Sequence, residues 1–269
     1  MRPLGLLGTA AFVSKTTRQD GETVKERLQT WRAAIDKRAP FGESGARSLH
    51  GGSALAASCA TPRRRICVIG DSGAGAVRIA LGDRGAPGAY EFAFFASAGS
   101  KFGRVGLDGD CVAGFEVDSG GDRDLRGYDA FVLQGRLPTA CGALAFERHL
   151  RPLRYSQDVR ALALRDWRDS HKGWAMALTL HERYRKPVLA ISRNIFAGER
   201  VGAKAERGQA DAAFAAMLAP LRFVAFPDSL FEHDGQVRRQ FYNDEWHYNC
   251  AAGDLILDSL IARLDAAFV

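Results

Sequence analysis

A serine, a histidine and an aspartate occupy positions from which they could form a hydrolytic triad. Ser72 follows the apolar run at residues 66–69, and Asp244 lies three residues before His247, directly ahead of the last predicted helix. A serine attacks an acyl carbon only when a base accepts its proton, and a histidine serves as that base when a carboxylate orients its ring. The residue types therefore predict ester chemistry with Ser72 as nucleophile, His247 as general base and Asp244 as the orienting acid.

Each half of this triad also has a simpler interpretation. Asp71 or Ser72 can cap the helix that follows, because short polar side chains accept hydrogen bonds from the first N–H groups of a helix. His247 can be an exposed loop residue, since an aspartate and a histidine three apart also occur by chance. Catalysis is favoured because both motifs precede predicted helices and because glycines flank Ser72, which lets the backbone approach a ligand closely.

Short apolar strands alternate with helices over residues 66–269. This alternation predicts an α/β domain with a parallel five-stranded sheet that helices cover on both faces. Ligands bind such sheets at the carboxyl ends of the strands, so we expect Ser72 and the turns at 96–99, 134–136 and 192–194 to surround one crevice. The expected strands are 66–69, 90–96, 128–133, 187–191 and 221–226, and the expected helices are 73–81, 156–184, 207–219 and 251–268.

Residues 1–65 differ from the rest of the chain in composition. A helix-capable segment at 21–37 precedes a stretch rich in Gly, Ser and Ala, and we interpret the whole as an N-terminal extension, flexible or partly helical, outside the core. The extension carries 12 of the 37 basic and 5 of the 31 acidic residues, so residues 66–269 hold 25 basic and 26 acidic ones. Because the excess positive charge lies on the extension, nucleic acid is not an expected partner of the domain.

The cysteines and the apolar segments indicate in which cellular compartment the protein is expected. The five cysteines are scattered, with no C-x-x-C pair, which favours neither a zinc site nor a disulfide framework and indicates a reducing, cytoplasmic location. Residues 4–13 have the outline of a signal peptide, so secretion or a periplasmic location is the alternative. No run approaches the roughly 20 apolar residues of a transmembrane segment. The cysteines are Cys59, Cys67, Cys111, Cys141 and Cys250.

Two sequence blocks resemble a known superfamily. Residues 66–72, Ile-Cys-Val-Ile-Gly-Asp-Ser, and residues 244–249, Asp-Glu-Trp-His-Tyr-Asn, resemble the first and last blocks of the SGNH/GDSL hydrolases. The resemblance implies a flavodoxin-like three-layer α/β/α sandwich with the activity of an esterase, lipase, thioesterase, or carbohydrate O-acyl esterase or acyltransferase. It implies the same roles for Ser72, His247 and Asp244. It extends over residues 66 to about 265 in layout and is specific at the two ends.

Between these ends the chain departs from the superfamily pattern. The resemblance implies that Gly99, after the second strand, takes the place of a glycine whose N–H joins the oxyanion hole in the superfamily. The Gly-x-Asn-Asp block expected after the third strand is replaced by Gln-Gly-Arg-Leu-Pro, which contains Gln134, Gly135 and Arg136 but lacks the asparagine. Arg136 or Gln134 could donate to the oxyanion in its place. Asn194, after the fourth strand, is a further candidate donor or a turn residue.

The segments around Ser72 and His247 also allow two other functions, dinucleotide binding and thiol chemistry. The sequence Gly-Asp-Ser-Gly-Ala-Gly after a strand resembles a dinucleotide-binding turn, but Val77 and Arg78 stand where Gly or Ala is expected, and the acidic residue would have to be Glu91, which starts its strand. Cys250, close after His247, could form a thiol–imidazole pair, although a buried cysteine at a helix start is the ordinary interpretation. The histidines outside the triad show no metal-ligand spacing.

The sequence thus predicts a serine hydrolase or O-acyltransferase acting on a small-molecule or carbohydrate acyl ester, with no metal or cofactor. The alternative is a non-catalytic, carbohydrate-binding relative with the same fold, in which Arg136 and Arg193 bind an anionic sugar.

Overall fold

The computed structural model describes residues 63–85, 88–98, 101–118, 121–135, 137–150, 153–192, 195–245 and 247–269. The predicted N-terminal extension, residues 1–65, therefore lies outside the described residues except for its last three positions. The boundary proposed there stays a prediction.

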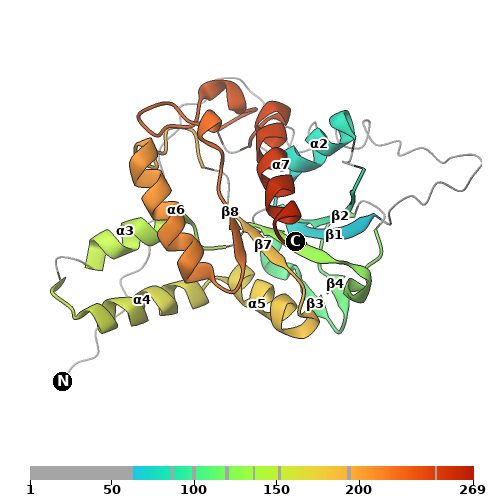
Figure 1. The fold of residues 1–269 in the computed structure, drawn as a ribbon, viewed down its shortest axis with the longest axis horizontal. Helices are drawn as coiled ribbons and strands as arrows, with labels where there is room; N and C mark the ends of the chain where they lie inside the picture. Colours follow the sequence, from blue (N-terminus) through green and yellow to red (C-terminus); the bar gives the residue numbers. More distant parts are fainter. Residues whose placement is uncertain are drawn as a thin grey trace, which may run out of the picture. The chain divides into compact units, whose positions relative to one another are not determined.

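The described chain folds around one twisted sheet (Figure 1). Five strands pair in parallel in the order β2-β1-β6-β7-β8, and the short strand β5 adds to β2 in antiparallel orientation at one edge. The sheet expected from sequence thus has a sixth strand. The strands are β1 (Arg64–Gly70), β2 (Tyr90–Ala96), β5 (Val117–Asp118), β6 (Ala130–Gln134), β7 (Val188–Ile191) and β8 (Arg222–Val224).

Helices cover both faces of this sheet, as a parallel sheet requires. The helices α2 (Ala74–Arg84) and α7 (Cys250–Asp265) pack on one face, where they share a hydrophobic core with Val68, Val132 and Ile191. Figure 1 shows these two helices side by side. The opposite face carries α5 (Lys172–Tyr184) and α6 (Lys204–Leu218). The α/β fold class expected from the sequence is therefore confirmed.

Two further helices lie outside this sandwich of layers. Helix α3 (Ala140–Leu150) contacts α6, and α4 (Gln157–Asp169) contacts α3 and α5. The sequence pattern predicted one helical region over 156–184 and missed α3. The structure divides that region at Ser170 and His171, because the chain turns there between α4 and α5. Trp174 in α5 is buried, whereas α4, which carries Trp167, has no buried residue.

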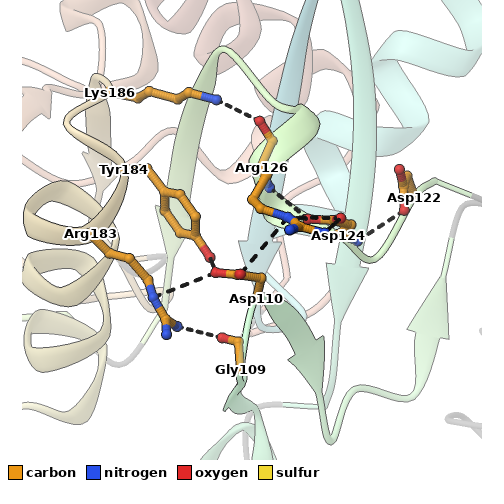
Figure 2. Close-up of polar contacts among 8 residues, drawn as sticks. All are labelled: Gly109, Asp110, Asp122, Asp124, Arg126, Arg183, Tyr184 and Lys186. Carbon is orange, nitrogen blue, oxygen red and sulfur yellow. Dashed lines mark hydrogen bonds and ion pairs between the residues drawn. The ribbon is translucent and has the colours of Figure 1, made fainter.

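The segment between β2 and β6 forms a small hairpin, β3 (Gly106–Asp108) and β4 (Cys111–Ala113). Figure 2 shows that Asp110, which lies in the turn between β3 and β4, contacts residues at the end of α5. The Tyr184 hydroxyl donates to Asp110 Oδ1 at 2.7 Å, and Arg183 Nη1 donates to the carbonyl of Gly109 at 2.5 Å. Burial and this hydrogen bond raise the pKa of Tyr184 to about 12. The network lies by the amino end of β6, away from the crevice.

Single-turn helices complete the described elements. They are η1 (Phe102–Arg104), η2 (Leu125–Gly127), η4 (Asp228–Leu230) and η5 (Arg239–Phe241).

The contact between α2 and α7 depends on a missing side chain at Gly253. A Cβ placed there would lie 2.2 Å from the Ala76 carbonyl oxygen and 3.3 Å from Ala80 Cβ. Gly253→Ala therefore separates the helices and is expected to lower the free energy of unfolding by about 2 kcal/mol. Urea denaturation measures this change.

The matched control is the same substitution in an open helix position. A Cβ at Gly208, inside α6, has nothing within 4 Å, so Gly208→Ala is expected to raise the free energy of unfolding by about 0.5–1 kcal/mol. Equal effects of the two substitutions would contradict the close approach of α2 and α7.

Candidate active site

The strand order has a topological switch point between β1 and β6, because the chain adds β2 on one side of β1 and β6, β7 and β8 on the other. In open parallel sheets ligands bind at such a point, outside the carboxyl ends of the strands. Backbone hydrogen bonds hold these ends together: Asp71 N–H donates to the Gln134 carbonyl at 3.0 Å, and Ser97 N–H donates to the Gly70 carbonyl at 3.1 Å. The residues after β1 and β6 therefore lie together where the sequence predicts a site, and their role stays a prediction.

Ser72 lies in the turn that leads from β1 into α2. The N-cap residue of α2 is Gly73, with no side-chain cap hydrogen bond, and Asp71 Oδ1 accepts a hydrogen bond from Gly73 N–H at 2.8 Å. The carbonyls of Asp71 and Ser72 accept from the N–H groups of Ala74 and Gly75 at 3.1 and 3.2 Å. Within the described part of the chain, the Ser72 hydroxyl and its N–H form no hydrogen bond, and the residue is half-buried. Both groups are therefore available for other contacts at the carboxyl end of β1.

Gly135 brings the end of β6 against this turn. Its φ is +96°, which side-chain-bearing residues rarely adopt, and a Cβ there would lie 2.1 Å from Asp71 Oδ2. A glycine is required at this position for two reasons: it adopts the positive φ without strain, and it has no Cβ to collide with the Asp71 carboxylate. Gly135, predicted from sequence as an oxyanion or substrate-binding residue, thus lies next to the turn that carries Ser72.

His247 and Asp244 pair as predicted. His247 Nδ1 lies 2.8 Å from Asp244 Oδ2 and 3.0 Å from Oδ1, and the backbone N–H of His247 donates to Oδ1 at 2.8 Å. A carboxylate beside Nδ1 favours the tautomer with the proton on Nδ1, which leaves Nε2 to accept a proton. The side chain of His247 is 29% exposed, so solvent and small molecules reach it.

The loop that carries His247 is fixed to the end of β7. The Tyr248 hydroxyl accepts a hydrogen bond from Ile195 N–H at 3.0 Å, and the Tyr242 hydroxyl donates to the Ile195 carbonyl at 2.6 Å. Ala197 N–H donates to the Glu245 carbonyl at 3.1 Å. Burial, followed by the negative charge of Glu199, raises the pKa of Tyr242 to about 12. Tyr242 therefore stays a neutral donor across the physiological pH range.

The packing of α7 on α2 connects the two segments that carry the predicted triad residues. Ser72 lies just before α2, His247 lies just before α7, and these helices touch where Gly253 meets Ala76. Cys250 donates from Sγ to Asp83 Oδ2 at 3.3 Å. Within the described residues, no hydrogen bond joins Ser72 to His247, so their cooperation stays a prediction.

Of the other predicted site residues, only Gln134 lies within the described ranges. Gln134 is fully buried at the end of β6. Gly99, Arg136, Arg193 and Asn194 lie outside the described residues, and their predicted roles remain predictions.

A cavity of about 40 Å³ lies beside the carboxyl ends of β7 and β8. Its wall is mostly apolar, and the ring of Phe226, which is part of that wall, packs 5.9 Å from the ring of Tyr248. Arg207 in the same wall is 8% exposed and pairs with Asp228 at 2.8 Å. Burial raises the pKa of Asp211 nearby. The apolar lining is formed by Ala140, Ile195, Val201, Ala210, Phe223, Phe226 and Phe231.

Sequence reasoning missed this cavity. Its lining comes from α3, α6, β8 and the loops before α3, after β7 and after β8, and no spacing along the chain connects them. The charged residues Arg207 and Asp211 lie four apart on α6, a spacing that ordinary surface ion pairs also show.

Neither a membrane helix nor a metal cluster is found in the described ranges. No helix there is both long and apolar enough to cross a bilayer, and no group of three or more His, Cys, Asp or Glu side chains is arranged to hold a metal ion.

Comparison with known proteins gives likenesses of fold. No family model and no curated protein sequence matches the chain. Among solved structures, a protein described as an acylhydrolase from Bacteroides fragilis has a TM-score of 0.43 at 12% identity, covering 77% of this chain and 92% of its own. A protein described as a platelet activating factor from Streptococcus pneumoniae has a TM-score of 0.41 at 14% identity, covering 77% and 86%. A lipase from a goat rumen metagenome has a TM-score of 0.37 at 13% identity, covering 74% and 96%.

The approach of β6 to the Ser72 turn can be tested at Gly135. Gly135→Ala combines backbone strain with a collision with the Asp71 carboxylate, so we expect the free energy of unfolding to fall by about 3 kcal/mol. Thermal and urea denaturation measure the loss.

Gly109→Ala provides the control for backbone strain alone. Gly109 also has a positive φ, +57°, but a Cβ there has nothing within 4 Å, so about 1 kcal/mol of destabilisation is expected. If Gly135→Ala were as mild as Gly109→Ala, the close packing of Gly135 on Asp71 would be wrong.

Proposed function

We propose that the protein is a serine hydrolase or O-acyltransferase that cleaves or transfers the acyl group of an oxygen ester. One observation carries the proposal. A histidine whose Nδ1 is held by a carboxylate and a serine whose hydroxyl is not used as a helix cap both lie before helices that pack together by the switch point of a parallel sheet. Acyl transfer through an activated serine needs a nucleophile and an oriented base close together, and the packing of these helices supports such an approach of Ser72 and His247.

The proposed reaction has two half-reactions. Ser72 Oγ attacks the acyl carbon while His247 Nε2 accepts the hydroxyl proton, and Asp244 stabilises the imidazolium that forms. The tetrahedral intermediate collapses, the C–O bond to the alcohol breaks, and His247 returns its proton to the departing oxygen. Water, or the hydroxyl of an acceptor, then attacks the Ser72 ester with His247 again accepting the proton. The acyl group leaves as an acid or as a new ester, and free Ser72 is restored.

Negative charge on the carbonyl oxygen needs donors at the turn. The N–H of Ser72 forms no hydrogen bond within the described residues and precedes α2, where the helix dipole favours an anion. We propose this N–H as an oxyanion donor. Gly135 is proposed to keep the end of β6 close enough to complete the site, and Gly99, Arg136 and Asn194 remain proposed donors.

The substrate is proposed to be a small-molecule or carbohydrate acyl ester. The apolar cavity beside β7 and β8 would take an apolar group of a few atoms, because a volume of about 40 Å³ exceeds the roughly 10–15 Å³ that one water molecule needs on this measure. The described cysteines Cys67, Cys111 and Cys250 are free thiols, in keeping with the proposed cytoplasmic location.

A fluorophosphonate probe tests the nucleophile. Wild-type protein is expected to become labelled, because an activated serine attacks phosphorus as it does an acyl carbon. Ser72→Ala is expected to abolish labelling, and His247→Ala to slow it by about 10⁴-fold. Intact-protein mass spectrometry measures both.

Ser229→Ala serves as the matched serine control, since Ser229 is exposed in η4 and lies outside the proposed site. It should label like wild type. Persistent labelling of Ser72→Ala would sink the catalytic assignment, and a complete lack of wild-type labelling would favour the non-catalytic, carbohydrate-binding alternative.

The orienting role of Asp244 predicts a separate kinetic change. Asp244→Asn keeps the size of the side chain but removes the charge that stabilises the imidazolium, so kcat for ester hydrolysis is expected to fall by about 10²–10⁴-fold with a small change in KM. Steady-state kinetics with p-nitrophenyl esters checks this. A kcat within twofold of wild type would show that Asp244 does not orient the base.

A further inference from the structure

The side-chain amide of Gln134 is buried without a hydrogen bond. Gln134 ends the central strand β6, it is 0% exposed, and neither Nε2 nor Oε1 has a hydrogen-bond partner among the residues that the structure describes. Burying an amide without partners costs free energy, because its hydrogen bonds to water are lost and nothing replaces them. The rest of β6 is apolar, as expected for a strand buried on both faces. A leucine or methionine would suit this position better if packing were the only requirement.

The position of Gln134 in the sheet places it at the proposed site. It pairs with Gly70 of β1 on one side and Ile191 of β7 on the other. The backbone carbonyl of Gln134 accepts a hydrogen bond from the N–H of Asp71, the residue before Ser72. Strand alternation puts its side chain on the same face as Ala130 and Val132, the face that α2 and α7 cover.

Both triad motifs belong to this face. Ser72 leads into α2, and Tyr248, next to His247, is part of the same buried cluster as Val132 and Ile191. The amide without a hydrogen bond therefore lies at the carboxyl end of β6, next to the topological switch point. Open parallel sheets bind ligands at such a point.

The amide also limits the chemistry of the missing partner. Its NH₂ group needs an acceptor and its carbonyl needs a donor. A simple alkyl or aryl ester offers acceptors only. A hydroxyl group offers both, because it donates its proton and accepts at its lone pairs. The alcohol part of the substrate should therefore carry a free hydroxyl close to the ester bond.

We propose that Gln134 is a specificity residue that binds a hydroxyl group of the substrate, so that the preferred substrate is an O-acyl ester of a polyol or sugar. This rests on the proposed ester chemistry at Ser72. Since the amide is covered in this structure, the ligand reaches it through a local movement at the crevice of the size that ligand binding commonly involves. The amide is unsatisfied without ligand and satisfied with it.

The experiment compares two matched ester series in Gln134→Met. Methionine keeps the length of the side chain and removes both polar atoms. The first series consists of mono-O-acyl methyl glucosides, which retain free hydroxyls, and the second of p-nitrophenyl esters of the same acyl groups. We expect kcat/KM for the glucosides to fall at least about tenfold, and kcat/KM for the p-nitrophenyl esters to stay within about twofold.

A stability measurement accompanies the kinetics. Removing a buried unsatisfied amide is expected to raise the Tm of Gln134→Met by about 3 °C or more, which a residue needed only for packing would not show. Gln134→Leu serves as a second apolar variant. Ile191→Met, the strand partner on the same face, is the control that changes a buried side chain without removing a polar group, and it should leave the ratio of the two activities unchanged.

The outcomes separate the two proposals. Loss on the glucosides alone, with a higher Tm, supports hydroxyl recognition by Gln134. Equal loss on both series, no loss on either, or failure of wild-type protein to cleave any glucoside ester while it cleaves p-nitrophenyl esters overturns it. Absence of both fluorophosphonate labelling and p-nitrophenyl ester cleavage instead refutes the ester chemistry itself and, with it, the recognition that rests on it.

Discussion

The structure depends on the close approach of two strand ends, β1 and β6. Gly70 and Gly135 permit it, because a Cβ at Gly70 would lie 3.2 Å from the Gln134 carbonyl oxygen and one at Gly135 would lie 2.1 Å from Asp71 Oδ2. The Asp71 N–H then reaches the Gln134 carbonyl at 3.0 Å. This single contact fixes where β1 stops and where α2 starts. The placement of Ser72 at the edge of the sheet follows from it.

The second half of the site is positioned by helix packing. Gly253 lets α7 lie against α2, and hydrogen bonds from Tyr242 and Tyr248 fasten the loop of His247 to Ile195 after β7. Ser72 and His247, which are 175 positions apart in the chain, thereby come to the starts of neighbouring helices. The Asp244–His247 pair needs no distant partner for its own geometry, since both residues belong to one tight loop.

The sequence pattern predicted those parts of the fold that local physics controls. Strand β2 has the expected bounds, and β1 and β6 differ from expectation by one or two residues at each end, because short apolar runs bounded by Gly and charged residues have few alternatives. Helix α3 was missed, since its sequence Ala-Cys-Gly-Ala-Leu-Ala-Phe contains a glycine and follows a proline. The edge strand β5 has only two residues and exists through its pairing with β2. No local signal marks such a strand.

The candidate site divides in the same way. The Asp244–His247 contact was predictable because the two residues are three apart in one loop. The unsatisfied state of Gln134 was not, because it depends on what surrounds the amide in three dimensions. The same holds for the cavity at Phe226 and Arg207, whose walls come from separate elements.

The central claim is that Ser72 forms a covalent acyl intermediate. The most direct measurement is acid quenching during turnover of a p-nitrophenyl ester, followed by trypsin digestion and peptide mass spectrometry. Cleavage after Arg65 and Arg78 releases residues 66–78, in which Ser72 is the one serine. Burial raises the pKa of the Cys67 thiol in the same peptide, which keeps it unreactive, and fragmentation distinguishes the two sites. The account predicts the acyl mass on Ser72; an acyl group on another residue, or turnover with no acylated peptide, would contradict it.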